Sequence, residues 1–355
     1  MPNPAGEQAA ARELRQGHRA GGFGRTVWSA DRGRYNEGGL SYKTMKNDST
    51  LRLGARGSLL SRMQSRQVAD ALEKRHPGLR VESLNFKTSG DVIADRPLHE
   101  AGGKGLFTRE LELALLEGRI DFAVHSFKDV PVTMPLVEQA QLTVAAVPVR
   151  EDVRDVLVCA GARRIEDLPR GAKVGTGSLR RRCQLLAVRP DLDVQPIRGN
   201  VDTRLKKVRE GQYAAIVLAM AGLRRSGLFD EADMMPLDAE AFLPAAGQGA
   251  LAIQCRSSDQ SARGILAALN DPGTAQCVNL ERELVRKLNG DCYSPIAARA
   301  QVSRGRIKLQ AAVGARGGGL PVVRSSAQAP IGCADEALEQ VFNSLVEQGA
   351  LNRLA

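Results

Sequence analysis

The feature that most constrains the fold is an alternation of strand-like and helix-like segments, which begins near residue 51. "LRLGAR" over 51–56 is typical of a strand, and Ser58 can cap a following helix whose apolar residues recur at helical spacing. A strand over 80–86, a helix over 105–118 and a buried strand over 120–126 continue the alternation. Five more strands are expected near 142–147, 156–160, 172–176, 193–197 and 214–219. This alternation predicts mostly parallel sheets covered by helices.

The alternation stops near residue 271, where a different pattern begins. A helix is expected over about 274–289 and another over about 335–348, with three strand-like runs between them. Those runs cover 296–302, 306–313 and 320–327. The pattern is typical of a small α+β domain.

We therefore expect an α/β protein with two α/β domains and a small C-terminal α+β domain. The segment "FLPAAGQGALAIQC" over 242–255 is expected to return the chain to the first domain. The predicted domains are 51–149 with 246–268 for domain 1, 153–243 for domain 2 and 271–355 for domain 3.

Residues 1–50 differ from the rest, because they are rich in Gly, Arg, Asn and Ser and have little periodic apolar content. Such a segment cannot bury enough apolar surface to fold, so we predict a disordered N-terminal extension. Two alternatives stay open, a transit peptide and a true start at Met45. The transit peptide is disfavoured by acidic residues at Glu7, Glu13, Asp31 and Glu37.

The composition narrows the class of protein. Six cysteines are scattered without CxxC pairs or metal-ligand spacing, which predicts reduced thiols, no metal and a cytoplasmic location. No apolar run approaches the roughly 18 residues that a membrane span requires. The net charge of +10 would suit nucleic acid, but aromatic residues make up only 4% and no basic run is interleaved with them. We therefore predict no nucleic-acid or membrane partner, and prefer a small acidic ligand bound by selected arginines over a merely solvated basic surface.

One buried strand delivers polar residues to a sheet edge. "DFAVHSFKDVP" over 121–131 places Lys128 and Asp129 at the carboxyl end of that strand, where open α/β sheets bind ligands. On an extended chain these neighbours point to opposite sides, so Lys128 is not expected to neutralise Asp129. The alternative is that Asp129 is an ordinary turn residue before Pro131.

A second stretch, "GTGSLRRRCQL" over 175–185, places arginines at a predicted helix start. The positive end of the helix dipole disfavours them, unless an anion lies among them. Backbone N–H groups of 175–178 would bind that anion, and Arg180 and Arg181 would add paired donors. The alternatives are a solvated helix face and a phosphate-binding loop, although GxxxxGK[ST] is absent.

Cations recur at other strand ends and helix starts. Arg198 and Arg204 flank a predicted helix start in "PIRGNVDTRL", and Arg56, Lys104 and Arg225 occupy similar places. This recurrence predicts a ligand with several acidic groups. A separate candidate functional residue is Cys292 in the loop "LNGDCYSP". Its thiol is either a nucleophile or an inert, packed side chain.

Several of these motifs occur in an order that resembles the porphobilinogen deaminase (hydroxymethylbilane synthase) family. They are "GGKGLF", "AVHSFKDVP", "GTGSLRRRCQL", "RGNVDTRL", "LPAAGQGALAIQCR" and the cysteine loop. The resemblance runs from about residue 51 to the end of the chain. It implies three domains, of which the first two resemble periplasmic-binding-protein lobes.

The resemblance also implies the chemistry. Enzymes of this family are transferases of tetrapyrrole and heme biosynthesis that join four porphobilinogen units into hydroxymethylbilane and release ammonia. They extend a covalent dipyrromethane cofactor, which Cys292 would carry through a thioether. Asp129 matches the catalytic acid, whose carboxylate stabilises positive charge at a pyrrole N–H. The enzyme is expected to be a cytoplasmic monomer with porphobilinogen as its small-molecule substrate.

The resemblance assigns a set of substrate- and cofactor-binding positions. These are Arg56, Ser58, Lys104, Lys128, Thr176, Ser178, Arg180, Arg181, Arg198, Asn200, Arg204, Arg225 and Gln248. Arg182 is expected to be a bystander. Four residues depart from the family pattern, namely Leu59, Glu100, Gly177 and Asp202. Of these, Glu100 and Asp202 add negative charge, which would weaken binding of an acidic ligand or tune its release.

Overall fold

The computed structural model describes residues 49–88, 105, 108–132, 141–159, 161–291, 293–318 and 321–354. The chain divides into two compact units, Met1–Met45 and Lys46–Ala355, and every described residue lies in the second. Most of the predicted N-terminal extension is therefore outside the described residues. Its last two positions already belong to the first strand, β1 (Ser49–Arg56), which begins slightly earlier than the sequence predicts.

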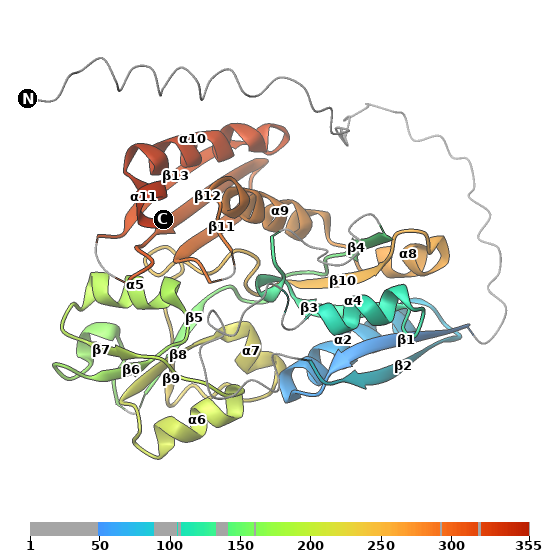
Figure 1. The fold of residues 1–355 in the computed structure, drawn as a ribbon, viewed down its shortest axis with the longest axis horizontal. Helices are drawn as coiled ribbons and strands as arrows, with labels where there is room; N and C mark the ends of the chain where they lie inside the picture. The colour runs from blue at the N-terminus through green and yellow to red at the C-terminus, as the bar shows by residue number, and fades with distance from the viewer. Residues whose placement is uncertain are drawn as a thin grey trace, which may run out of the picture. The chain divides into compact units, whose positions relative to one another are not determined.

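The first sheet has the strand order β2-β1-β3-β10-β4 (Figure 1). β1 pairs in parallel with both neighbours, whereas β10 is antiparallel to both of its own. Helices α2 and α8 supply apolar side chains to the core on one face, and α4 supplies those on the other. The remaining bounds are β2 Leu79–Phe86, β3 Phe122–Ser126, β4 Leu142–Ala146, β10 Leu251–Arg256, α2 Leu59–Arg75, α4 Arg109–Leu116 and α8 Gln260–Ala267.

The second sheet has the order β7-β6-β8-β5-β9 (Figure 1). β6 pairs in parallel with β7 and β8, and β5 is antiparallel to β8 and β9. Helix α5 packs on one face of this sheet, and α6 and α7 pack on the other. The bounds are β5 Asp155–Val158, β6 Lys173–Gly175, β7 Asp193–Gln195, β8 Ala215–Ala219, β9 Met234–Pro236, α5 Leu179–Val188, α6 Val201–Arg209 and α7 Met220–Arg225.

Both sheets fit the prediction of mostly parallel sheets, since four of the five strands in each run in the same direction. In each, the fourth strand is antiparallel, and β10 joins the first sheet only after the chain has built the second. The predicted return of the chain over 242–255 is confirmed by β10. Strand direction could not be predicted because a strand buried on both faces has the same apolar pattern in either orientation. The short strand β9 and helix α8 were not predicted at all.

The C-terminal part is an antiparallel sheet, β11-β12-β13, that shares one core with helices α9 and α10. This arrangement confirms the predicted α/β class with a small α+β unit. The strands of the three sheets fall within the three predicted domains, apart from the early start of β1, but the domain boundaries themselves stay a prediction. The bounds are α9 Pro272–Lys287, β11 Ile296–Ser303, β12 Arg306–Val313, β13 Val323–Pro330, α10 Ala334–Glu347 and α11 Ala350–Leu354.

Candidate functional site

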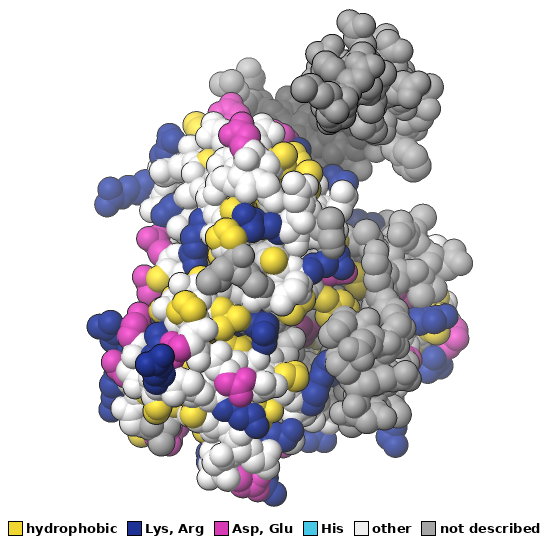
Figure 2. Space-filling model, turned by 60° about the vertical axis from the view of Figure 1, so that its left-hand side comes forward, with side chains coloured by type: hydrophobic (Ala, Val, Ile, Leu, Met, Phe, Trp, Pro, Cys, Tyr) yellow, Lys and Arg dark blue, Asp and Glu magenta, His cyan; other side chains and the backbone are white. Residues whose placement is uncertain are grey.

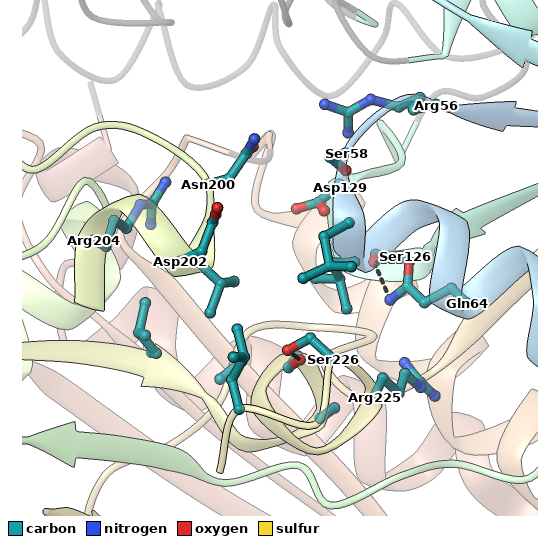
Figure 3. Close-up of a pocket in the computed structure, with 18 of the residues that line it drawn as sticks. Arg56, Ser58, Gln64, Ser126, Asp129, Asn200, Asp202, Arg204, Arg225 and Ser226 are labelled. Atoms are coloured by element: carbon teal, nitrogen blue, oxygen red, sulfur yellow. Dashed lines mark hydrogen bonds between the residues drawn. The ribbon is translucent and has the colours of Figure 1, made fainter. Parts of the chain in front are cut away.

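A cavity of about 640 Å³ lies between elements of the first two sheets. The end of β1 and the turn after β3 line it from the first sheet, and the start of α6 and helix α7 line it from the second. Figure 3 shows Arg56 and Asp129 on one side, with Asn200 and Arg204 opposite them. The cavity brings together nine of the predicted site residues, namely Arg56, Ser58, Lys128, Asp129, Arg181, Arg198, Asn200, Arg204 and Arg225.

Several of these positions follow from local sequence. Ser58 caps α2 as predicted, since its Oγ accepts a hydrogen bond from the N–H of Ser61 at 3.3 Å. Asn200 stands at the N-cap of α6. Just before it, Gly199 has φ +109°, and a Cβ there would lie 2.7 Å from a carbon of Thr203. This entrance to α6 therefore requires glycine.

Asp129 lies at the end of a 3-10 helix, η1 (Phe127–Asp129), directly after β3. Its side chain is exposed and lines the cavity, as does that of Lys128. The sequence prediction that the two point to opposite sides is wrong, because the chain is a tight turn here rather than an extended strand. Burial lowers the pKa of Lys128 to about 8, with nearby arginines adding to the effect and Asp129 opposing it.

Two arginines near α6 share one side of the cavity. Arg204 donates from Nε to the carbonyl of Gly199 at 2.7 Å. Its pKa is lowered to about 10, first by burial and then by the charges of Arg181 and Arg198. Like charges repel one another, so this arrangement favours an anion in the cavity.

Arg225 supplies a donor from helix α7. It donates from Nη2 to the carbonyl of Gly249 at 2.7 Å. Its Nε atom is buried and finds no hydrogen-bond partner among the described residues. A buried donor without a partner is costly, so Arg225 is held in the cavity wall at a cost in stability.

The arginines at the start of α5 have a different surrounding from the one predicted. Asp155 is fully buried, and its two oxygens accept from Arg180 and from Arg181 at 2.7 Å each. Gln248 donates to the same carboxylate at 3.0 Å. Burial alone would raise the pKa of Asp155, but the two guanidinium groups outweigh it and lower the pKa. An acid of the chain, and not a ligand, therefore compensates these two arginines.

Two of the four N–H groups of the predicted anion-binding loop before α5 are bound within the chain. The N–H of Thr176 donates to the carbonyl of Gln195 at 2.9 Å, and that of Ser178 donates to Thr176 Oγ1 at 3.2 Å. Neither residue lines the cavity, and neither do Arg180 and Gln248. Arg182 donates to the carbonyl of Val194, in keeping with its expected bystander role.

Two predicted site residues, Lys104 and Cys292, lie outside the described residues, as does Glu100. The residues on either side of Cys292 in the chain take part in local hydrogen bonds. The N–H of Tyr293 donates to Asp291 Oδ1 at 3.0 Å, and the N–H of Asp291 donates to Ser294 Oγ at 2.9 Å. Asp291 and Ser294 therefore shape the loop that carries the cysteine.

Sequence reasoning missed one residue of this region, Asp155. The available signal was its position at the start of the strand "DVLV", which is otherwise apolar and fully buried. Ionised side chains are almost never fully buried without a partner, so an acid there indicated a cation nearby. The sequence did not show which cation pairs with Asp155, because Arg180 and Arg181 lie in another element, α5.

Comparison with known proteins decides the family. A family model described as "Porphobilinogen deaminase, dipyromethane cofactor binding domain" matches residues 51–264, and one described as "Porphobilinogen deaminase, C-terminal domain" matches residues 275–338. A "Porphobilinogen deaminase" from Roseiflexus sp. (strain RS-1) is 45% identical over 303 residues, which cover 84% of this chain and 98% of that relative. The chain belongs to the porphobilinogen deaminase family. As a member of this family, it is a transferase of tetrapyrrole biosynthesis with porphobilinogen as its substrate and dipyrromethane as its cofactor.

The solved structures that match this chain share little sequence with it. The OxyR regulatory domain from Pseudomonas aeruginosa has a TM-score of 0.37 at 14% identity, covering 66% of this chain and 100% of that one. The substrate-binding protein of an amino acid ABC transporter has a TM-score of 0.34 at 16% identity, covering 62% and 91%. Because both scores are low, the fold rests on the sheet topology described above.

On the face shown in Figure 2, lysines and arginines are interspersed with acidic residues. Within the described ranges, every helix is too short or too polar to cross a bilayer.

Proposed function

We propose that the cavity between the first two sheets is where this chain joins four porphobilinogen units into hydroxymethylbilane. The observation that carries the proposal is the exposed carboxylate of Asp129 in a cavity that several arginines also line. A pyrrole with two acidic substituents needs both features, cations for its carboxylates and one anion for its N–H.

The residues of the cavity fit an acidic oligopyrrole. Each pyrrole of the family's substrate carries an acetate and a propionate, so the ligand gains two carboxylates at every addition. The carboxylates would be bound by the arginines that line the cavity, namely Arg56, Arg198, Arg204 and Arg225. A hydrogen bond to a charged group contributes about 1.5–3 kcal/mol, so a few of them suffice for one pyrrole.

Asp129 would act on the substrate. Loss of ammonia from porphobilinogen leaves positive charge on the pyrrole, and an ionised carboxylate close to the pyrrole N–H stabilises it. The free α-carbon of the chain then attacks, and the same carboxylate can accept the proton that this carbon loses. Because η1 places Asp129 in the cavity and not in the core, the carboxylate is accessible to successive pyrroles.

Cys292 would carry the cofactor through a thioether. When bound, dipyrromethane supplies the free α-position that is extended. The chain's own contribution is to present the sulfur on the loop after α9, next to the turn that Asp291 and Ser294 shape.

Intact-protein mass spectrometry tests this proposal. After expression in cells that make porphobilinogen, the protein is expected to be heavier than its sequence by one dipyrrole and to colour with Ehrlich's reagent. Cys292→Ser should remove the added mass, whereas Cys333→Ser, a change at an exposed free cysteine, should retain it. An unmodified wild-type mass would favour a non-catalytic binding protein for an organic polyacid, which needs neither Asp129 nor Cys292.

We also propose that the enzyme is a cytoplasmic monomer without nucleic-acid or membrane partners. The free thiols of the five described cysteines support a reducing compartment. Light scattering should give the mass of one chain. A gel shift at low salt should show no DNA binding, and a salt-sensitive shift would contradict this part.

A further inference from the structure

One arginine of the C-terminal unit contacts the turn that carries Asp129. Arg282 of α9 donates from Nη1 to the carbonyl of Val130 at 2.8 Å and from Nη2 to that of Pro131 at 2.7 Å. A longer bond of 3.4 Å reaches the carbonyl of Phe127. The guanidinium carbon also lies 4.6 Å from the centre of the Phe127 ring. One side chain thus contacts the turn on both sides of Asp129.

These contacts require the shape of arginine. A planar guanidinium can donate in several directions while its face stacks on an aromatic ring, whereas a lysine ammonium is a single point charge. The start of the turn is bound separately, since the N–H of Phe127 donates to the carbonyl of Ala250 at 3.0 Å. Asp129 lies between these two attachments, so Arg282 determines where the second half of the turn lies.

Helix α9 is itself bound to segments that flank the strands β4 and β10 of the first sheet. The buried Glu281, next to Arg282, pairs with Arg150 at 2.7 Å and accepts from the N–H of Gly247 at 2.7 Å. Val278 of the same helix belongs to one apolar cluster with Phe127. The C-terminal end of α9 leads into the loop of Cys292, so one helix contacts the turn of Asp129 and precedes the proposed attachment point.

We propose that Arg282 is a positioning residue for Asp129. It holds the turn so that the carboxylate keeps a constant place relative to the pyrrole being added. The inference rests on the proposed role of Asp129. A displacement of about 1 Å at a reacting group can lower a rate by about a hundredfold, so the turn is a point where positioning matters.

A double-mutant cycle measured as kcat tests this inference. Arg282→Gln should lower kcat by about ten- to a hundredfold in the wild-type background, with little change in KM. In an Asp129→Asn background the same change should lower kcat by less than about threefold, because the carboxylate that it misplaces is already gone. Arg286→Gln, one turn later on an exposed part of α9, is the matched control and should leave kcat unchanged.

Two further measurements separate positioning from loss of structure. Intact mass should show that each variant still carries its dipyrrole, and urea unfolding should show that it is folded. If Arg282→Gln is unfolded, the cycle is run with Arg282→Lys, and a folded lysine variant with full kcat overturns the proposal. Equal losses of kcat in both backgrounds also overturn it. Full turnover of Asp129→Asn alone would instead contradict the proposed function.

Discussion

Two groups of arginines in this protein differ in where their counter-charge comes from. The buried pair, Arg180 and Arg181, shares the carboxylate of Asp155 inside the second sheet's unit. The cavity group, Arg56, Arg198, Arg204 and Arg225, lines the space that Asp129 also faces. Arg204 is close enough to other arginines that their charge lowers its pKa.

Because their counter-charges have different sources, the two groups of arginines are expected to have different roles. An arginine whose anion is part of the chain contributes to the fold, and removal of that anion leaves buried charge behind. An arginine that faces a cavity among like charges is stabilised by a ligand's anions. Arg181 belongs to both groups, since it lines the cavity while bound to Asp155.

The largest expected effect is on stability and comes from the buried pair. Asp155→Asn keeps the side chain's size but leaves two buried guanidinium groups without an anion. We expect the free energy of unfolding to fall by about 3–5 kcal/mol. Urea unfolding measures it, with Asp193→Asn, a change at an exposed position of the same sheet, as the control. A loss below about 1 kcal/mol would show that the pair does not depend on Asp155.

Substitution of an arginine of the cavity group should lower activity and not stability. Arg204→Gln is expected to lower kcat/KM for porphobilinogen by about ten- to a hundredfold, which corresponds to one lost charged hydrogen bond. Stability should be unchanged or slightly higher, because repulsion from neighbouring arginines is removed. Arg209→Gln, an exposed change on the same helix, serves as the control. A variant that loses stability but keeps kcat/KM would place Arg204 in the structural group.

Lys128 lines the cavity and is also affected by the charges of the buried pair. Its pKa in the folded protein is lowered from 10.5 to about 8, mainly by burial. Between these two values the unfolded chain binds more protons than the folded one, so stability should rise with pH across the window. The slope from this one group is at most about 1.4 kcal/mol per pH unit. The difference in unfolding free energy between wild type and Lys128→Met, measured from pH 8 to pH 10, isolates it. A difference that does not vary with pH would contradict the lowered pKa.

The smallest expected effect concerns Asp202, an acid that lines the cavity beside the arginines of the cavity group. Asp202 lines the cavity, as shown in Figure 3, so its charge opposes an acidic ligand. Asp202→Asn should lower KM by about two- to fivefold, the range of an exposed charge interaction. The steady-state KM measured at low and high salt checks this, since salt should reduce the difference. A higher KM in the variant would show that Asp202 assists binding.

The sequence predicted the elements and motifs well and the partnerships poorly. The strand before Lys128 and the helix after Ser58 follow from local apolar spacing and capping, and both were found. The antiparallel direction of β10 and the pairing of Asp155 with Arg180 depend on segments that are far apart in the chain. No local pattern encodes such partners, and for this reason the pairing of Arg180 and Arg181 with an acid of the chain was not predicted.

The tight turn at Asp129 also depends on a distant partner that the local sequence does not reveal. The motif "HSFKDVP" placed a carboxylate at the end of a buried strand, which the structure confirms. Its backbone was expected to be extended, and the actual 3-10 turn is stabilised in part by Arg282 from a helix about 150 residues later. The residue could be selected from the sequence, whereas its surroundings could not.

The central claim is that an exposed carboxylate among cations performs the chemistry. Turnover of Asp129→Asn, measured on folded protein whose intact mass shows the bound dipyrrole, tests it most directly. We expect kcat to fall by about 10²–10³-fold or more, with the free energy of unfolding nearly unchanged because the side chain is exposed. Turnover within about twofold of wild type in that loaded protein would contradict the account.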